Sequence, residues 1–245
     1  TSGGSTAEAA ARVGRRCACL GRAAGTLAAM LIRTMASVLL CAAAVAGCQS
    51  KAGPSADIAK IADLKSSFGK QFAVSEVPPT GIDPKFLTGQ KLPEGLKFSP
   101  ANCAQFAAGQ LVPNGTEGNM AAVSAEGEGN RFIIIAVETN DPVPVSEPGN
   151  DCRKVTFDGG TVRGAVEAVE VPKIEGTTTI GVHRVIQTTV NGKPRTGEVF
   201  NYSAHFGRYQ VIVSANPLVL PNKPMVPVNN QRARDLLIAG VNAIR

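Results

Sequence analysis

Hydrophobic positions along this chain recur with two different periods. From Ile58 to Phe68 they return every three or four residues, which is the spacing of one face of a helix, and Ser55 or Asp57 can cap its start. Several segments between residues 72 and 215 instead alternate between apolar and polar, or form short apolar runs bounded by turn residues, which is typical of strands. A second helical pattern begins near Asn229 or Asn230. The order predicts an α+β fold, an antiparallel sheet with N- and C-terminal helices packed on it.

The strand pattern is clearest in seven segments. These predicted strands are 72–77, 120–125, 131–138, 162–171, 177–190, 198–205 and 209–215. Both faces of 131–138 are apolar, so we expect this strand to be central. A short helix is also expected over residues 100–109.

Asn191 and Gly192 favour a tight hairpin turn after Val190, although Pro194 and Gly197 can lengthen the loop. The strands on either side of this turn carry apolar residues in alternation. If the register aligns their inward sides, one apolar face combines Ile180, Val182, Ile186 and Val190 with Phe200, Tyr202 and Ala204.

Two segments rich in proline interrupt the regular pattern. The first carries five large apolar side chains, which predict a loop packed on the body: Phe86, Leu87, Leu92, Leu96 and Phe98. The second proline-rich segment runs from Leu218 to Val228 and connects the last predicted strand to the final helix. Together they could cover one face of the sheet and enclose an apolar cavity, or they could simply complete the core, and the sequence leaves both readings open.

The N-terminal part has the pattern of a targeting segment. Arg33 precedes an apolar run over residues 36–46, which is too short for the ~20 residues of a membrane span but has the length of a signal-peptide core. We therefore divide the chain into a signal segment (1–47), a tether (48–56) and a single extracytoplasmic α+β domain (57–245). One interpretation of residues 1–29 is an upstream extension that the cell does not use, and the sequence leaves Met30, Met35 or an upstream codon as alternative starts.

Val45, Ala46, Gly47 and Cys48 resemble the lipobox of bacterial lipoproteins, with valine in place of the commoner leucine. The resemblance implies that the Cys48 sulfur receives a diacylglyceryl group and that Cys48 becomes the new N-terminus. Two or more acyl chains hold a protein stably on a bilayer. We expect a lipid-anchored protein on the extracytoplasmic face of the cell membrane. An ordinary secretory signal or an uncleaved apolar helix are the alternatives.

Charge argues against a nucleic-acid partner. The chain carries 25 Lys and Arg against 19 Asp and Glu, a net +6. Five arginines and one glutamate lie in 1–47, so residues 48–245 carry only +2. There is no tryptophan and there are only two tyrosines, whereas base-stacking surfaces need exposed aromatic side chains.

Of the six cysteines, only Cys103 and Cys152 lie beyond the lipobox. A single pair in an exported chain predicts a disulfide, and closing a loop of about 50 residues would contribute on the order of 4 kcal/mol. Two separate buried thiols are the alternative. Metal ligation is disfavoured because no Cys or His stands at ligand spacing from either residue, and we expect no cofactor.

The two histidines are the candidates for catalysis. We expect His183 and His205 on the more polar face of the sheet, near each other and near Ser203. They would form a weak metal or acid–base site, or an ordinary solvent-side or loop-covered pair. The sequence has no nucleophile elbow and no glycine-rich nucleotide-binding loop. We therefore expect a protein that is not an enzyme.

The lipobox, the helix before the sheet, the cysteine pair and the terminal helix together resemble the small surface lipoproteins of mycobacteria and related actinobacteria, and more distantly the extracellular sensor domains of their receptor Ser/Thr kinases. No functional residue transfers with this resemblance. The leading hypothesis is an envelope lipoprotein whose domain binds an unknown ligand or protein partner. A carrier of a lipid in a cavity between sheet and helix is the second hypothesis, and a hydrolase using His183 or His205 is the third. The sequence does not determine the oligomeric state.

Overall fold

The computed structural model describes residues 55–83, 92–109, 112–113, 115–145, 147–190, 192–221 and 224–245. All of them belong to one compact unit, Lys51–Arg245. The signal segment, Cys48 and the tether up to residue 54 lie outside the described residues, so the structure does not bear on them.

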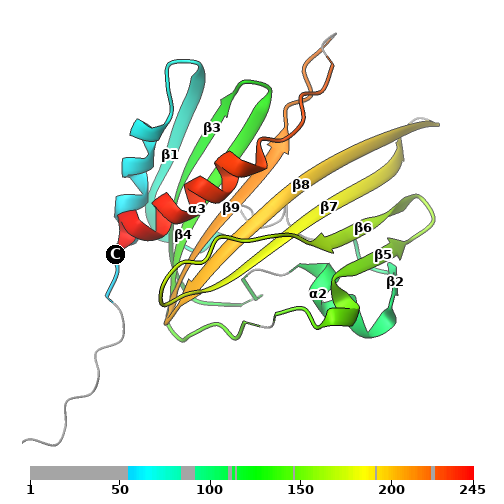
Figure 1. The fold of residues 1–245 in the computed structure, drawn as a ribbon, viewed down its shortest axis with the longest axis horizontal. Helices are drawn as coiled ribbons and strands as arrows, with labels where there is room; N and C mark the ends of the chain where they lie inside the picture. Colours follow the sequence, from blue (N-terminus) through cyan, green and yellow to red (C-terminus); the bar gives the residue numbers. More distant parts are fainter. Residues whose placement is uncertain are drawn as a thin grey trace, which may run out of the picture. The chain divides into compact units, whose positions relative to one another are not determined.

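Within these residues, one antiparallel sheet of nine strands dominates the fold (Figure 1), in the order β1-β3-β4-β9-β8-β7-β6-β5-β2. The strands are β1 (Phe72–Gly81), β2 (Lys97–Ser99), β3 (Gly118–Gly127), β4 (Asn130–Thr139), β5 (Lys154–Asp158), β6 (Val162–Ala168), β7 (Thr178–Val190), β8 (Lys193–Phe206) and β9 (Tyr209–Pro217). The helical segments are η1 (Ile58–Ser67), η3 (Ala101–Cys103), α2 (Ala104–Ala108), η4 (Asn150–Cys152) and α3 (Asn230–Ile244). The fold is therefore mostly antiparallel sheet with a C-terminal helix and short helices.

One face of the sheet, which we call the helix face, is covered by η1 and α3 over β1, β3, β4, β9 and β8 (Figure 1). The N-terminal helix is a 3-10 helix, and Asp57 caps it as one of the two predicted candidates, its Oδ1 accepting from the amide of Ala59 at 3.0 Å. Asn229 caps α3 by accepting from the amide of Arg232 at 3.0 Å. Between helices and sheet lies a packed core that includes Ile61, Leu237 and Val241.

The opposite face, which we call the disulfide face, is covered at β5, β6 and β7 by η3, α2 and η4. Cys103 and Cys152 form a disulfide there, with 5.4 Å between their Cα atoms. The pair joins the segment before α2 to η4, 49 residues further along the chain. A second apolar cluster lies beneath it and includes Ala107, Val155 and Val166.

The hairpin of β7 and β8 has the tight turn that the sequence predicts, because Val190 pairs with Lys193. The predicted apolar face of this hairpin is wrong. Ile180 pairs with Ser203 and Val182 with Asn201, so the apolar positions of β7 share a face with polar positions of β8. A two-residue turn after an even-numbered residue pairs even positions with odd ones, and paired residues share a face.

The two proline-rich segments behave differently. Leu92, Leu96 and Phe98 pack against the cluster beneath the disulfide, in line with a loop packed on the body, while Phe86 and Leu87 lie outside the described residues. The second crossing does not cover the sheet as one reading expected. Its apolar side chains Val219, Leu220, Met225 and Val226 are exposed, and Val228 packs against the core. None of the helices in the described residues has the length and apolar character needed to cross a membrane.

Candidate functional site

The two histidines lie on opposite faces of the sheet, so the predicted cluster of His183, Ser203 and His205 does not form. His183 pairs with Phe200, whereas His205 pairs with Thr178. On the helix face the His183 ring stacks on Phe200 at 4.0 Å between centroids, and its Nε2 lies 3.0 Å from Glu198 Oε2. In the register of this hairpin, odd-numbered residues of β7 pair with even-numbered residues of β8. Odd-numbered residues of the two strands therefore lie on opposite faces of the sheet.

Ser203 and His205 do meet, on the disulfide face. His205 Nε2 lies 3.0 Å from Ser203 Oγ. Burial lowers the pKa of His205 to about 4, so the ring is neutral at pH 7. Ser203 is completely buried and is therefore not placed to attack a substrate.

A pocket of about 270 Å³ opens between the disulfide face and the segments joined by the disulfide. We call it the disulfide pocket. Its walls combine apolar and polar side chains. They include Phe106, Ile180, Val182, Arg184, Asn201 and His205. The loop before η4 contributes Pro144, Val145 and Pro148.

Arg184 is the most unusual group in this pocket, because its side chain is only 1% exposed. Its Nη2 donates to the carbonyl of Ala107 in α2 at 3.4 Å. Gly109 ends α2 with φ 65° and ψ 39°, the left-handed conformation that favours glycine. A Cβ at Gly109 would lie 2.1 Å from Arg184 Nη2, so the absence of a side chain also makes room for the guanidinium.

Burial lowers the pKa of Arg184 to about 10 and leaves the side chain charged at pH 7. Next to it on the same face, Asn201 Oδ1 accepts from Ser214 Oγ at 2.5 Å. Sequence reasoning missed both Arg184 and Asn201. The signal was present, because Arg184 has the same strand parity as Ile180, Val182 and Ile186 and therefore stands among apolar positions.

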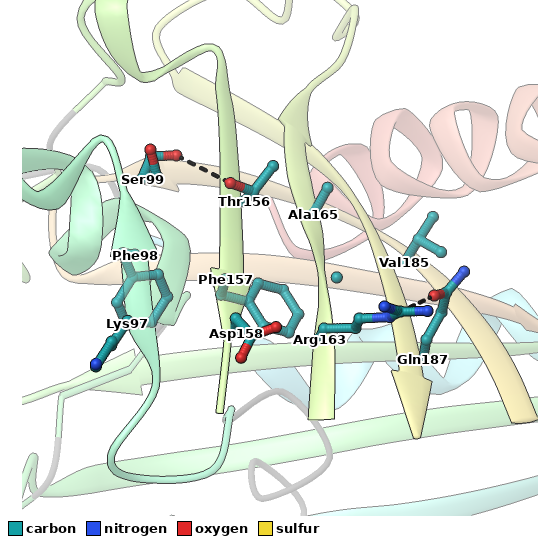
Figure 2. Close-up of a pocket in the computed structure, with 11 residues that line it drawn as sticks. Lys97, Phe98, Ser99, Thr156, Phe157, Asp158, Arg163, Ala165, Val185 and Gln187 are labelled. Carbon is teal, nitrogen blue, oxygen red and sulfur yellow. Dashed lines mark hydrogen bonds between the residues drawn. The ribbon is translucent and has the colours of Figure 1, made fainter. Parts of the chain in front are cut away.

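A larger hollow of about 560 Å³ lies on the other face, across β2, β5, β6 and β7 (Figure 2). We call it the β2–β5 groove. Arg163 Nε donates to Gln187 Oε1 at 3.1 Å along its rim, and Thr156 Oγ1 donates to the carbonyl of Ser99 at 3.4 Å (Figure 2). The polar rim residues Lys97, Asp158, Arg163 and Gln187 are all exposed.

The two hollows differ in what a ligand would meet. Exposed polar groups are already solvated, so they contribute little to selectivity, whereas a buried charge in a partly apolar pocket is where binding sites concentrate. The disulfide pocket is therefore the better candidate site, although the groove is larger. No group of three His, Cys, Asp or Glu side chains suited to a metal ion occurs among the described residues.

Within the part of the chain that the structure describes, the fold and site define a class of protein: an antiparallel-sheet domain, braced by the Cys103–Cys152 disulfide, with a small mixed pocket beneath it. The chain belongs to the family described as Domain of unknown function DUF5642, which matches residues 57–245.

A solved structure with high similarity is the X-ray structure of an uncharacterised protein from Mycobacterium smegmatis, the Rv0999 ortholog. It is 61% identical, covers 78% of this chain and 98% of its own, and has a TM-score of 0.73. A distant match is the extracellular domain of PknH from Mycobacterium tuberculosis, at 11% identity, 75% and 90% coverage and a TM-score of 0.35. That similarity is too low to bear on the function of this chain. No curated protein matches the sequence.

Proposed function

We propose that this protein is an envelope lipoprotein whose extracytoplasmic domain binds a small ligand in the disulfide pocket. The observation that carries the ligand site is the disulfide pocket itself, where buried polar groups on β7 and β8 stand among apolar walls. Such a mixture orients a ligand through a few polar contacts while the apolar walls supply affinity.

The proposed location follows from two features of the sequence and fold. The lipobox ending at Cys48 supplies an export signal and an anchor. The Cys103–Cys152 disulfide is suited to an oxidising compartment outside the cytoplasm. Together they support a domain tethered to the outer face of the cell membrane.

The size of the pocket restricts the ligand. Its volume of about 270 Å³ lies below the usual range of roughly 300–1,000 Å³ for drug-sized ligands. A small molecule fits this space, whereas a lipid with two or more acyl chains does not. The space between α3 and the sheet, where a carrier cavity was one expectation, holds the fully buried side chains of Leu237, Val241 and Ile244.

We propose binding without catalysis. Ser203, the hydroxyl beside His205, is buried, and His183 lies on the other face of the sheet. A nucleophile and a base that together reach a substrate are therefore not provided by these residues. Activity assays on His183→Gln and His205→Gln check whether either histidine supports catalysis.

The test is a matched pair of pocket-filling substitutions on β7. Ile180 lines the disulfide pocket, while Val185 lines the β2–β5 groove on the other face, and both are partly buried. Native mass spectrometry of protein purified from its own host, together with an NMR screen of small fragments, would report binding. We expect Ile180→Trp to abolish bound mass and fragment shifts, and Val185→Trp to leave them unchanged. The reverse pattern would place the ligand in the groove and reject the proposal.

A further inference from the structure

Four apolar side chains in the crossing from β9 to α3 are exposed to solvent. They are Val219, Leu220, Met225 and Val226, and Val219 is 78% exposed. We call these four side chains the apolar tip. Residues 218–221 leave the sheet at the end of β9, and residues 224–228 lead back to the start of α3 (Figure 1). An exposed apolar segment of this kind is typical of a contact site for a protein or a membrane.

The base of the crossing is held by the rest of the fold. The amide of Leu218 donates to the carbonyl of Gly129 at 2.8 Å. At the other end, Val228 packs against the core and Asn229 caps α3. A Cβ on Gly129 would lie 2.6 Å from Val226 Cγ2, so the crossing also contacts the β3–β4 turn. The fold therefore fixes both ends of the crossing and presents the residues between them to the outside.

Prolines suit this crossing to the surface of a bilayer. Pro217, Pro221, Pro224 and Pro227 have no amide hydrogen, so four of the eleven residues from 217 to 227 have no backbone donor. A backbone N–H group that leaves water without a new partner is costly. The crossing can therefore enter the interfacial layer of a membrane with fewer lost hydrogen bonds than an ordinary loop.

The charges of this part of the chain favour an anionic partner. No Asp or Glu occurs between Glu198 and Asp235, a stretch that contains four Lys or Arg. Two of these cations, Arg232 and Arg234, lie in the first turn of α3, directly after the crossing. Apolar side chains accompanied by basic residues bind most tightly to membranes that contain anionic lipids.

The proposed anchor can reach the same bilayer. Cys48 and Asp57 are nine residues apart, and an extended chain of that length spans about 30 Å. The amide of Asp57 donates to the carbonyl of Ile244 at the end of α3, while the crossing enters α3 at Asn230. The 15 residues of α3 correspond to about 22 Å. Because the tether reaches further than the length of α3, lipid on Cys48 and the apolar tip can meet one bilayer with α3 lying along its surface (Figure 1).

We propose that the apolar tip inserts into the interfacial layer of an anionic bilayer, as a second contact beside the lipid on Cys48. This inference goes beyond the ligand site and rests on the anchor in the proposed function. An acyl anchor alone leaves the domain free to rotate above the membrane. Two contacts at opposite ends of α3 fix its orientation.

The test places the environment-sensitive fluorophore nitrobenzoxadiazole on a cysteine that replaces Val219 or, as a control, Thr161. Thr161 is an exposed residue of the turn between β5 and β6. Changing Cys17, Cys19 and Cys41 to alanine leaves the introduced cysteine as the thiol that is labelled. The full chain, purified from host membranes, is reconstituted into vesicles of equal parts phosphatidylglycerol and phosphatidylcholine.

We expect the emission of the Val219 label to shift to the blue, to rise at least twofold in intensity and to be quenched by lipids that carry a nitroxide. The Thr161 label should show none of these changes. A Val219 label that stays in a water-like environment on these vesicles would overturn the proposal. Cross-linking of two chains through unlabelled Val219→Cys, without quenching of the label by the nitroxide lipid, would assign the apolar tip to a second copy of the chain and also overturn it.

Mass spectrometry of the same preparation reports whether Cys48 carries lipid, which separates this proposal from the anchor. With lipid present and no blue shift, the anchor stands and the membrane contact of the apolar tip is rejected. Without lipid, the anchor is rejected, and the Cys48→Ala chain mixed with the same vesicles decides the second contact. A blue shift of the Val219 label then supports that contact, and an unchanged spectrum overturns it.

A matched pair of substitutions tests the apolar character of the tip. Leu220→Asp adds a charge to the apolar tip, and Val190→Asp adds the same charge to an exposed apolar residue at the end of β7. With the label on Met225→Cys, we expect Leu220→Asp to reduce the blue-shifted emission at least twofold and Val190→Asp to leave it unchanged. Both side chains are exposed, so neither change disturbs the core. Loss of the blue shift in Val190→Asp with retention in Leu220→Asp would overturn the assignment.

Discussion

Gly109 and Arg184 lie so close together that a methyl group on Gly109 would stand 2.1 Å from the guanidinium Nη2. Gly109 also has φ 65°, which is strained for any residue with a side chain. Gly109→Ala should therefore destabilise the protein by roughly 1–3 kcal/mol, through strain together with displacement of Arg184. Chemical denaturation measures the loss.

Gly160 provides the control for this substitution. Its φ is 81°, but a Cβ there would meet nothing within 4 Å. Gly160→Ala isolates the cost of the backbone conformation, so Gly109→Ala should be the more damaging change. If the two variants lost the same free energy of unfolding, the Arg184 guanidinium would move aside without an energetic cost.

His205 should make the protein less stable in acid. Burial lowers its pKa from 6.5 to about 4, so between these values the unfolded chain binds a proton that the folded chain does not. Its contribution to stability is complete above pH 6.5 and falls as the pH drops toward 4, by up to about 3 kcal/mol.

We therefore expect His205→Gln to gain stability relative to the wild type as the pH is lowered from 7 to 4, because the variant lacks this titration. Urea denaturation at each pH measures the free energy of unfolding of the wild type and of His205→Gln. The difference between the two values cancels the titration of the carboxylates, which both proteins share. His183→Gln, on the opposite face, serves as the matched control. The prediction would be contradicted if the free energies of unfolding of the wild type and of His205→Gln changed in parallel as the pH is lowered.

The disulfide should stabilise the fold and hold the pocket. Its residues are 49 positions apart, and the chain-entropy model gives about 4 kcal/mol for a loop of that length. The double variant Cys103→Ser, Cys152→Ser should lose much of this stability and bind small fragments in the disulfide pocket more weakly. Adding a reductant should lower the stability of the wild type and leave the double variant unchanged. Unaltered fragment binding in the double variant would show that the disulfide does not shape the pocket.

The lipid anchor is tested independently of the pocket. Cys48→Ala should remain an unlipidated precursor, and metabolic labelling with palmitate should be lost. Cys41→Ala, which changes a cysteine within the apolar run before the lipobox, should still be labelled. Persistent labelling of Cys48→Ala would remove the basis for the anchor.

Long, regular patterns predicted the fold best. Strand β4 has both faces buried, as its apolar composition indicated. It lies in the middle of the five strands that η1 and α3 cover. The short strands β2 and β5 were not predicted, because three to five residues carry too little periodicity to distinguish a strand from a loop. The 3-10 geometry of η1 was also beyond prediction, since its apolar spacing suits an α-helix equally well.

The candidate site shows where sequence reasoning stopped. Pairing of Val190 with Lys193 follows from Asn191 and Gly192, and extending that pairing along the strands places Ile180 opposite Ser203. The face shared by His205 and Arg184 could therefore have been derived from the turn alone. Closure of the pocket could not, because it depends on how α2 and the loop before η4 settle over the sheet once Cys103 and Cys152 join.

The amide of Asp57 donates to the carbonyl of Ile244 at 2.7 Å, so the described chain begins beside the end of its last helix (Figure 1). A pull transmitted through a membrane tether ahead of Asp57 would load this junction and the packing of η1 against α3 first. The disulfide pocket lies on the other face of the sheet, away from that line of force. If the chain is anchored as proposed, mechanical strain would therefore separate the helices from the sheet before it reached the proposed ligand site.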